Sequence, residues 1–264
     1  MHRVPRDVQE FLEGYLDGSN NKSLKANLEF YSNLRRCRPD NLLIDEILEQ
    51  WQGEYDILES RHGFIQWLFP IREHGMNFQS QPLQPHELES MKSDSTIIQR
   101  LIESYKLMLD FYGMQLLDEE TGELGRPSPP RRYAPRYKNL LRSTHNNLRI
   151  SRILKCLSEF GLERFNAGFL LYILTEQSES KELKSSALCG SMDRWWANCI
   201  RNNEERIWIA EKIALVRAGD GYVFTKEMYK DALDRRRKTG GLAEYRADPE
   251  PSEDAENKAG KETE

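Results

Sequence analysis

Residues 94–113 read DSTIIQRLIESYKLMLDFYG and decide the fold of this chain. Apolar residues recur in this stretch every three or four positions, at Ile98, Leu101, Ile102, Tyr105, Met108, Leu109 and Tyr112. Such a period predicts an α-helix that buries one face. Asp94 or Ser95 can cap the helix at its start, and Gly113 is a residue type that ends helices.

The same period recurs along most of the chain. It predicts further helices within 24–34, 40–51, 54–62, 144–160, 165–175, 183–199, 204–216 and 225–237. Strand signals are nearly absent, apart from a small hairpin predicted over 114–125. Prolines and glycines mark 71–93 and 127–137 as irregular connections. We therefore predict the all-α class, with helices packed around one core.

The length of 264 residues is enough for one domain with a sizeable core. We expect a loosely ordered N-terminal arm over 1–27, a helical domain over 28–238 and a disordered tail over 239–264. From Arg246 to Glu264 the tail holds seven acidic and three basic residues, a net charge of −4. Since the whole chain carries −5, the body before the tail is nearly neutral. The overall charge of the body therefore gives no reason to expect nucleic-acid binding.

Export and membrane spanning are disfavoured by the sequence. No stretch approaches the roughly eighteen consecutive apolar residues that a spanning helix needs. The first ten residues lack the apolar core of a secretory signal. Four cysteines lie at irregular spacing, namely Cys37, Cys156, Cys189 and Cys199. We expect free thiols in a reducing compartment, and so a protein that is not secreted.

Signatures of catalysis and cofactor binding are missing. The chain has no G-x-G-x-x-G, Walker A, G-x-S-x-G or H-E-x-x-H pattern. Its five histidines lie far apart, and none stands at metal-ligand spacing from another histidine or a cysteine. His145 and Cys156 resemble a base and a nucleophile, but a buried structural thiol is the simpler interpretation of Cys156. We expect no enzyme activity, no metal and no cofactor.

A basic stretch runs from Arg126 to Lys155 and carries nine Lys or Arg residues and no acid. Tyr133 and Tyr137 interleave with it, and cations beside aromatics can hold phosphates or stack on bases. We expect the three basic residues of the helix over 144–160 on its outer face: Arg149, Arg152 and Lys155. Two interpretations stay open, a site for nucleic acid or an acidic partner, and a cationic face paired with neighbouring acids.

A second basic cluster, Arg235-Arg236-Arg237-Lys238, precedes the acidic tail. Four exposed cations in a row are typical of a nuclear import signal, which an import receptor would bind. The alternative is the C-terminal turn of a helix, where cations suit the helix dipole.

Five segments resemble the conserved region of the opioid growth factor receptor family, and their order and spacing match as well. They are 27–31 (NLEFY), 51–59 (WQGEYDILE), 62–70 (HGFIQWLFP), 104–113 (SYKLMLDFYG) and 144–155 (THNNLRISRILK). The resemblance covers roughly residues 28–210. It implies a receptor for the opioid peptide Met-enkephalin that restrains cell growth. It also implies a location in the nucleus and at the nuclear envelope, with peripheral rather than spanning membrane association.

The family offers no ligand residues to carry over, so the candidate site follows from the peptide Tyr-Gly-Gly-Phe-Met. Its ammonium group needs an acid and an aromatic wall, for which Tyr55, Asp56 and Trp67 are the candidates. Its carboxylate needs a cation, for which Arg72 and Arg149 are the candidates.

Asn146 and Asn147 complete the candidate site, because side-chain amides can bond a peptide backbone. Alternatively, Asn146 simply caps its helix. Two functions are therefore carried forward. The first is a receptor-like protein that binds an opioid peptide without covalent chemistry. The second is a helical interaction module that binds nucleic acid or an acidic protein through the Arg126–Lys155 face.

Overall fold

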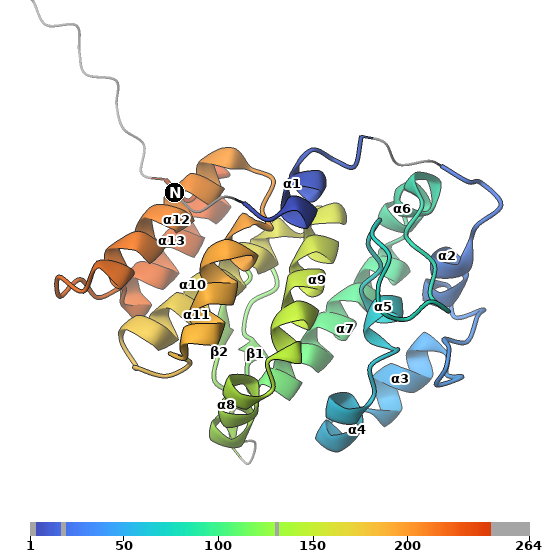
Figure 1. Cartoon of the computed structure of the whole chain (residues 1–264), viewed down its shortest axis with the longest axis horizontal. Coiled ribbons are helices and arrows are strands. Elements are labelled where there is room, and N and C mark those ends of the chain that lie inside the picture. Colours follow the sequence, from blue (N-terminus) through green and yellow to red (C-terminus); the bar gives the residue numbers. More distant parts are fainter. Residues whose placement is uncertain (1–3, 17–19, 130–131, 244–264) are drawn as a thin grey trace, which may run out of the picture.

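The computed structural model describes residues 4–16, 20–129 and 132–243, and the predicted tail from residue 244 onward lies outside this part. The described residues form thirteen α-helices and one two-stranded sheet, which confirms the predicted all-α class (Figure 1). The helices of the first half are α1 (Arg6–Leu12), α2 (Ala26–Tyr31), α3 (Ile44–Gln50), α4 (Tyr55–Ser60), α5 (Ile65–Leu68), α6 (Pro85–Lys92) and α7 (Ser95–Tyr112). Those of the second half are α8 (Tyr133–Arg142), α9 (His145–Glu159), α10 (Glu163–Ser178), α11 (Ser186–Arg194), α12 (Asn203–Ala218) and α13 (Lys226–Thr239). Among these helices, none is both long and apolar enough to cross a membrane.

Helix α7 begins and ends as its sequence predicts. The Asp94 carboxylate accepts hydrogen bonds from the backbone N–H groups of Thr96 and Ile97, at 2.8 and 3.3 Å. Gly113 ends the helix with a φ of 80°, a left-handed conformation that glycine adopts without a steric penalty. The helix packs on α3, α6 and α8, so it links the first half of the chain to the second.

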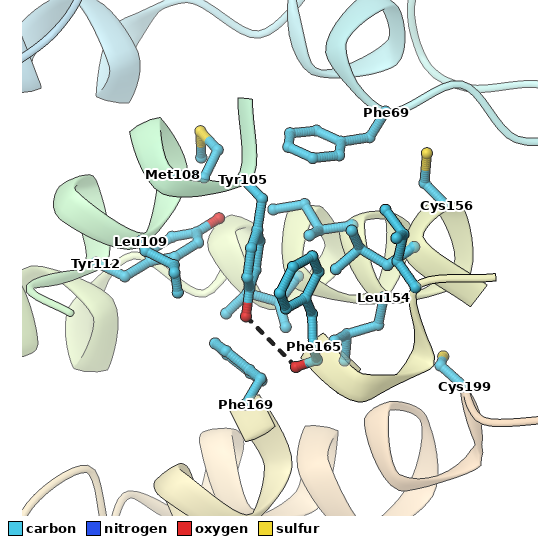
Figure 2. Packing of buried hydrophobic residues seen from close by; sticks show 14 of the residues in the cluster. Phe69, Tyr105, Met108, Leu109, Tyr112, Leu154, Cys156, Phe165, Phe169 and Cys199 are labelled. Atoms are coloured by element: carbon cyan, nitrogen blue, oxygen red, sulfur yellow. Dashed lines mark hydrogen bonds between the residues drawn. The ribbon is translucent and has the colours of Figure 1, made fainter. Parts of the chain in front are cut away.

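Aromatic packing joins α7 to α10 in the centre of the molecule. The rings of Tyr105 and Phe165 stack with centroids 5.3 Å apart, and Tyr105 donates to the Phe165 carbonyl (Figure 2). Leu154 of α9 lies beside this pair, and it too is buried. Burying an aromatic side chain contributes about 2–3 kcal/mol at usual area coefficients, so this cluster is a main source of stability.

A small hairpin follows α7, as predicted. Its strands β1 (Gln115–Leu116) and β2 (Leu124–Gly125) pair antiparallel, with Gln115 opposite Gly125. The hairpin packs on α10, where Gly122 and Gly168 allow the two backbones to approach. A methyl group on Gly168 would stand 1.9 Å from the Gly122 carbonyl oxygen.

The structure differs from the sequence predictions at several helices, of which α3, α6 and α8 are the most informative. Helix α3 begins after Leu43 rather than at Asp40, because Glu46 reaches back to the Leu43 N–H at 3.0 Å. Helix α6 lies inside the predicted connection 71–93, and Glu87 caps it in the same way. Helix α8 starts at Tyr133, inside the predicted loop, since a proline in the first turn of a helix costs no hydrogen bond.

The N-terminal segment is docked where the structure describes it. Helix α1 buries Val8 and Phe11 completely and lies beside α9 (Figure 1). The guanidinium group of Arg201 lies 4.4 Å from the centre of the Phe11 ring and donates to the Phe11 carbonyl at 3.1 Å. These contacts bring α1 to the edge of the groove described below.

Candidate peptide-binding groove

One face of helix α9 forms the floor of a groove. His145, Leu148, Arg149, Arg152 and Lys155 line it, and their steps of three and four residues place them along one side of the helix. The expectation that Arg149, Arg152 and Lys155 lie on an outer face was therefore wrong. Arg149 and Lys155 are 5% and 2% exposed, because α1 and residues 58–76 cover them.

The groove has a volume of about 330 Å³, which is within the usual range of ligand sites. One wall comes from α5 and the loop that follows it, and the other from α1 and Trp195. Apolar side chains make up much of the surface, namely Ile65, Ile71, Met76, Leu148 and Trp195. Leu148 is 73% exposed and Met76 is 93% exposed, so the rim of the groove offers apolar contact to a ligand.

A charged cluster marks one end of the groove. The Lys155 ammonium lies 2.9 Å from the Asp7 carboxylate and 2.7 Å from that of Glu73. Burial alone would lower the pKa of Lys155, but its bonds to the two carboxylates raise it above the usual value. Tyr15 donates to the same Glu73 oxygen at 2.6 Å. Two carboxylates thus share one lysine at this end of the groove, and the charge of Arg152 also acts on Glu73.

Arg149 secures the segment that leads into the groove. Its guanidinium donates to the carbonyls of Leu58 at 2.8 Å and Arg61 at 2.6 Å, at the C-terminal end of α4. Burial lowers the pKa of Arg149. Nearby, Arg152 donates to the Phe69 carbonyl at 2.8 Å, and burial lowers its pKa to about 10. Both arginines therefore hold the wall of the groove in place.

Histidines mark the other end of the groove. His62 and His145 lie with ring centroids 5.3 Å apart, and His145 Nε2 is 3.2 Å from the Glu59 carboxylate. Burial, and then the charge of Arg149, lower the pKa of His145. His74 lines the groove as well. Within the described residues, no three His, Cys, Asp or Glu side chains are grouped to hold a metal.

The predicted ammonium pocket is not assembled. Asp56 is exposed on α4, whereas Trp67 is 2% exposed and donates to the Arg38 carbonyl from within the core. Tyr55 donates to Asp110 on α7 at 3.0 Å, and Arg136 lies over its ring. This tyrosine stands near a second cavity, of about 360 Å³, which α3, α7 and β1 line with Asp110 and Glu103 among its residues.

The other predicted residues lie at or near the groove, with Arg149 in its floor. Arg72 follows the wall and donates to the Gly14 carbonyl at 2.9 Å. Asn146 is fully buried and bonds Glu59 and Arg149, so it does not cap α9, which begins after Thr144. The Asn147 carbonyl accepts from Trp196 at 3.1 Å, and its side chain is buried.

Sequence reasoning missed Asp7, Glu73 and the three histidines of the groove. The signal in α9 was available, because an apolar residue and four basic or titratable residues share one helical face. Asp7 and Glu73 carried no comparable signal, since long-range packing alone brings them to Lys155.

The two basic clusters are largely occupied by partners. Arg126 forms an ion pair with Glu176 at 2.7 Å. Because Arg149 and Lys155 of α9 are also buried, the Arg126–Lys155 stretch does not form one continuous basic surface. On α13, Arg235 donates to the Leu242 carbonyl and Arg236 to Glu205, so both are half-buried. Arg237 and Lys238 are exposed and pair with Asp234.

Cys156 and His145 do not form a catalytic pair. Cys156 is fully buried, and burial raises the pKa of its thiol far above the usual value. A thiol held in its protonated form is a poor nucleophile. His145 stands eleven residues earlier on the same helix, and its Nε2 lies 3.2 Å from a Glu59 carboxylate oxygen instead.

The fold and the groove define an all-α domain with a ligand-sized groove along one helix. The chain belongs to the opioid growth factor receptor family, because the family's conserved region matches residues 20–219. Both walls and the floor of the groove lie within this match, apart from α1. No solved structure matches the fold.

Three relatives illustrate the similarity. The chain is 46% identical to the opioid growth factor receptor of Homo sapiens over 183 residues, covering 69% of this chain and 27% of the relative. It is 41% identical to the receptor of Mus musculus over 191 residues, covering 70% and 30%. Opioid growth factor receptor-like protein 1 of Mus musculus is 39% identical over 184 residues, covering 69% and 38%. The match thus spans about a third of each relative's length.

Proposed function

We propose that this chain is a receptor-like protein that binds a short opioid peptide, Met-enkephalin, in the groove along α9, and that it regulates cell growth. One observation carries the proposal: the groove joins a carboxylate cluster to a histidine cluster across an apolar floor. Family membership supports the receptor assignment.

The length of the groove suits a pentapeptide. From His145 to Lys155 the floor follows ten residues of α-helix, or roughly 15 Å. An extended chain of five residues spans about 17 Å. The two termini of the peptide would therefore reach the two charged ends.

The chemistry of the two ends suits the peptide termini. The carboxylates of Asp7 and Glu73 would bind the terminal ammonium. His62 and His145 would donate to the terminal carboxylate. Apolar residues between them, with Trp195 and Leu148 at the rim, would receive the Phe and Met side chains.

Binding would act through the elements that meet at the groove. Helix α1, α5 and α9 each contribute to it, so a bound peptide would stabilise their present packing over looser arrangements. The state with α1 docked would then be more populated. A partner that contacts the surface including α1 would therefore bind differently when the peptide is present.

Calorimetric titration of the full chain with Met-enkephalin tests the proposal. We expect heat of binding with the free peptide and at least tenfold weaker binding after acetylation of its amino terminus. Glu73→Gln should weaken binding to a similar degree, whereas Glu103→Gln in the second cavity should not. Equal affinity for free and acetylated peptides would contradict the assigned ammonium site.

We further propose a nuclear or perinuclear location, peripheral at the nuclear envelope, which rests on the family resemblance. The α13 cluster presents only Arg237 and Lys238 to solvent, so an import receptor would need the last turn of α13 to unwind. A fluorescent fusion of the full chain tests the location. Alanine at Arg237 and Lys238 should shift the signal to the cytoplasm if this cluster directs import.

The second function, binding of nucleic acid or an acidic partner, is less well supported, because several residues of the basic stretch are already occupied. Arg126, Arg149 and Lys155 already bond groups within the chain. Arg132, Lys138 and Arg142 of the α8 region remain exposed. The exposed cations among the described residues of this stretch would give only a shallow salt dependence of binding.

A further inference from the structure

A second feature of the chain lies away from the groove, in the segment 126–129 that connects β2 to α8. Ser128 and Pro129 are exposed in this segment, which has neither helix nor strand at Ser128. This dipeptide is the only Ser-Pro or Thr-Pro pair in the 264 residues. A single such pair at an exposed site identifies one candidate for modification.

The segment is held firmly on its N-terminal side. Arg126 forms an ion pair with Glu176 at 2.7 Å, and its guanidinium lies 4.1 Å from the centre of the Tyr133 ring. Pro127 is buried. Among the described residues, none forms a hydrogen bond with the Ser128 hydroxyl. The Ser128 hydroxyl is therefore open to solvent next to an anchored arginine.

We propose that Ser128 is a phosphorylation site for a proline-directed serine/threonine kinase. Such kinases bind an extended substrate and leave the amide after the acceptor serine unpaired, which suits proline because it has no N–H. A residue before proline also favours the extended conformation. In the sequence, Arg132 adds a basic residue on the C-terminal side of the pair.

The reaction uses ATP as the phosphoryl donor. The Ser128 oxygen forms a bond to the γ-phosphorus while the bond from that phosphorus to the bridging oxygen of ADP breaks. The hydroxyl proton passes to the catalytic base of the kinase, and ADP leaves. No oxidant or reductant takes part.

The surroundings of Ser128 favour the added charge. Helix α8, which begins five residues later, has no acid in its first turn and no side-chain cap. The basic stretch around it contains no acidic residue from Arg126 to Ser158. A phosphate, with a charge of about −1.5 to −2, would therefore pair with Arg132 and the helix N-terminus, and it would stabilise α8.

The test treats the full chain with ATP and a cyclin-dependent kinase, and it locates phosphate by mass spectrometry. We expect one phosphate on Ser128 of the wild type, none at that position in Ser128→Ala, and at least tenfold slower transfer in Pro129→Ala. Ser180→Ala is the matched control, because Ser180 is exposed but is followed by lysine. It should be phosphorylated at Ser128 like the wild type.

Melting temperatures separate the proposal from a folding defect. All three variants should melt within about 2 °C of the wild type, since these residues are exposed. The phosphorylated chain should melt about 1–4 °C higher than the unmodified chain. A folded chain that gains no phosphate on Ser128, or a Pro129→Ala variant that gains it at the wild-type rate, would overturn the proposal.

Discussion

Lys155 is a buried cation whose charge depends on two partners from distant parts of the chain. Its side chain is 3% exposed, and Asp7 and Glu73 reach it from α1 and from the loop after α5. Desolvation of an ammonium group is costly, and its bonds to the carboxylates offset that cost. The residue thus ties three segments together at the groove.

Replacing Lys155 should therefore cost more than the loss of a surface charge. We expect Lys155→Met to lower the free energy of unfolding by about 2–4 kcal/mol, because Glu73 loses its cation in a partly buried place. Lys138→Met, on the exposed face of α8, should change it by less than about 0.5 kcal/mol. Urea unfolding measures both, and equal losses would contradict the role of Lys155.

His145 should make stability depend on pH. Burial and Arg149 lower its pKa in the folded state below the unfolded value of about 6.5. A lowered pKa stabilises the fold above the unfolded pKa, and this contribution is lost as the pH falls through the folded pKa. The pKa of Glu59 is lowered as well: burial raises it, but hydrogen bonds, including one from Asn139, outweigh burial. The contribution of Glu59 to stability is therefore lost at a lower pH than that of His145.

We therefore expect the urea midpoint of the wild type to fall between about pH 7.5 and about pH 5.5. His145→Gln should show a smaller fall over the same range, because its side chain does not titrate. Unfolding curves for both proteins at the two pH values decide the matter, and identical pH dependence would rule out His145 as the cause.

At the scale of elements, the hairpin and α10 meet through two glycines. Gly122 has a φ of 80°, and a methyl group there would lie 2.3 Å from the Arg164 carbonyl oxygen. Gly168 meets the Gly122 carbonyl from the other side. Glycine inside α10 lowers the helix propensity of this segment, but its missing side chain allows the backbones of α10 and the hairpin to come into contact.

Alanine at Gly168 should therefore be harmful despite the better helix propensity. We expect Gly168→Ala to lower the free energy of unfolding by about 3 kcal/mol or more, since backbone must move. Gly190→Ala, where no atom lies within 3.4 Å of the added methyl group, should raise it by about 0.5–1 kcal/mol. Thermal unfolding of the two variants should give shifts of opposite sign.

Helix α1 should undock when its buried aromatic ring is removed. Phe11→Ala removes a fully buried side chain, so residues 6–13 should lose protection against hydrogen exchange while α7 and α10 keep it. Glu13→Ala is the control, because Glu13 is exposed. Unchanged protection of α1 in Phe11→Ala would show that its docking does not depend on this ring.

Elements with strong local signals were predictable from the sequence, and those without them were not. Helix α7 was predicted with both ends, because its period, its Asp94 cap and its Gly113 stop agree. Helices α6 and α8 were missed because prolines at their starts suggested loops, although proline suits a first helical turn.

At the scale of the whole molecule, the groove depends on segments far apart in sequence. Asp7, residues 62–76 and residues 145–155 meet there. The charge and the hydrophobic period of one segment cannot predict which distant segments it will contact. Asp56 and Trp67 were therefore assigned to a common pocket that the fold does not form. Arg149 was chosen only as a cation for the peptide carboxylate, and the structure places it in the floor of the groove, where it bonds the carbonyls of Leu58 and Arg61.

The match to the family covers about a third of each relative, so the receptor function proposed for this chain requires the groove to bind the peptide by itself. The direct test is hydrogen exchange of the full chain with and without saturating Met-enkephalin, read peptide by peptide. We predict slower exchange in residues 62–76 and 145–155, and in α1. Slowing confined to the second cavity, in residues 48–52 and 103–116, or no slowing at any segment, would contradict the account.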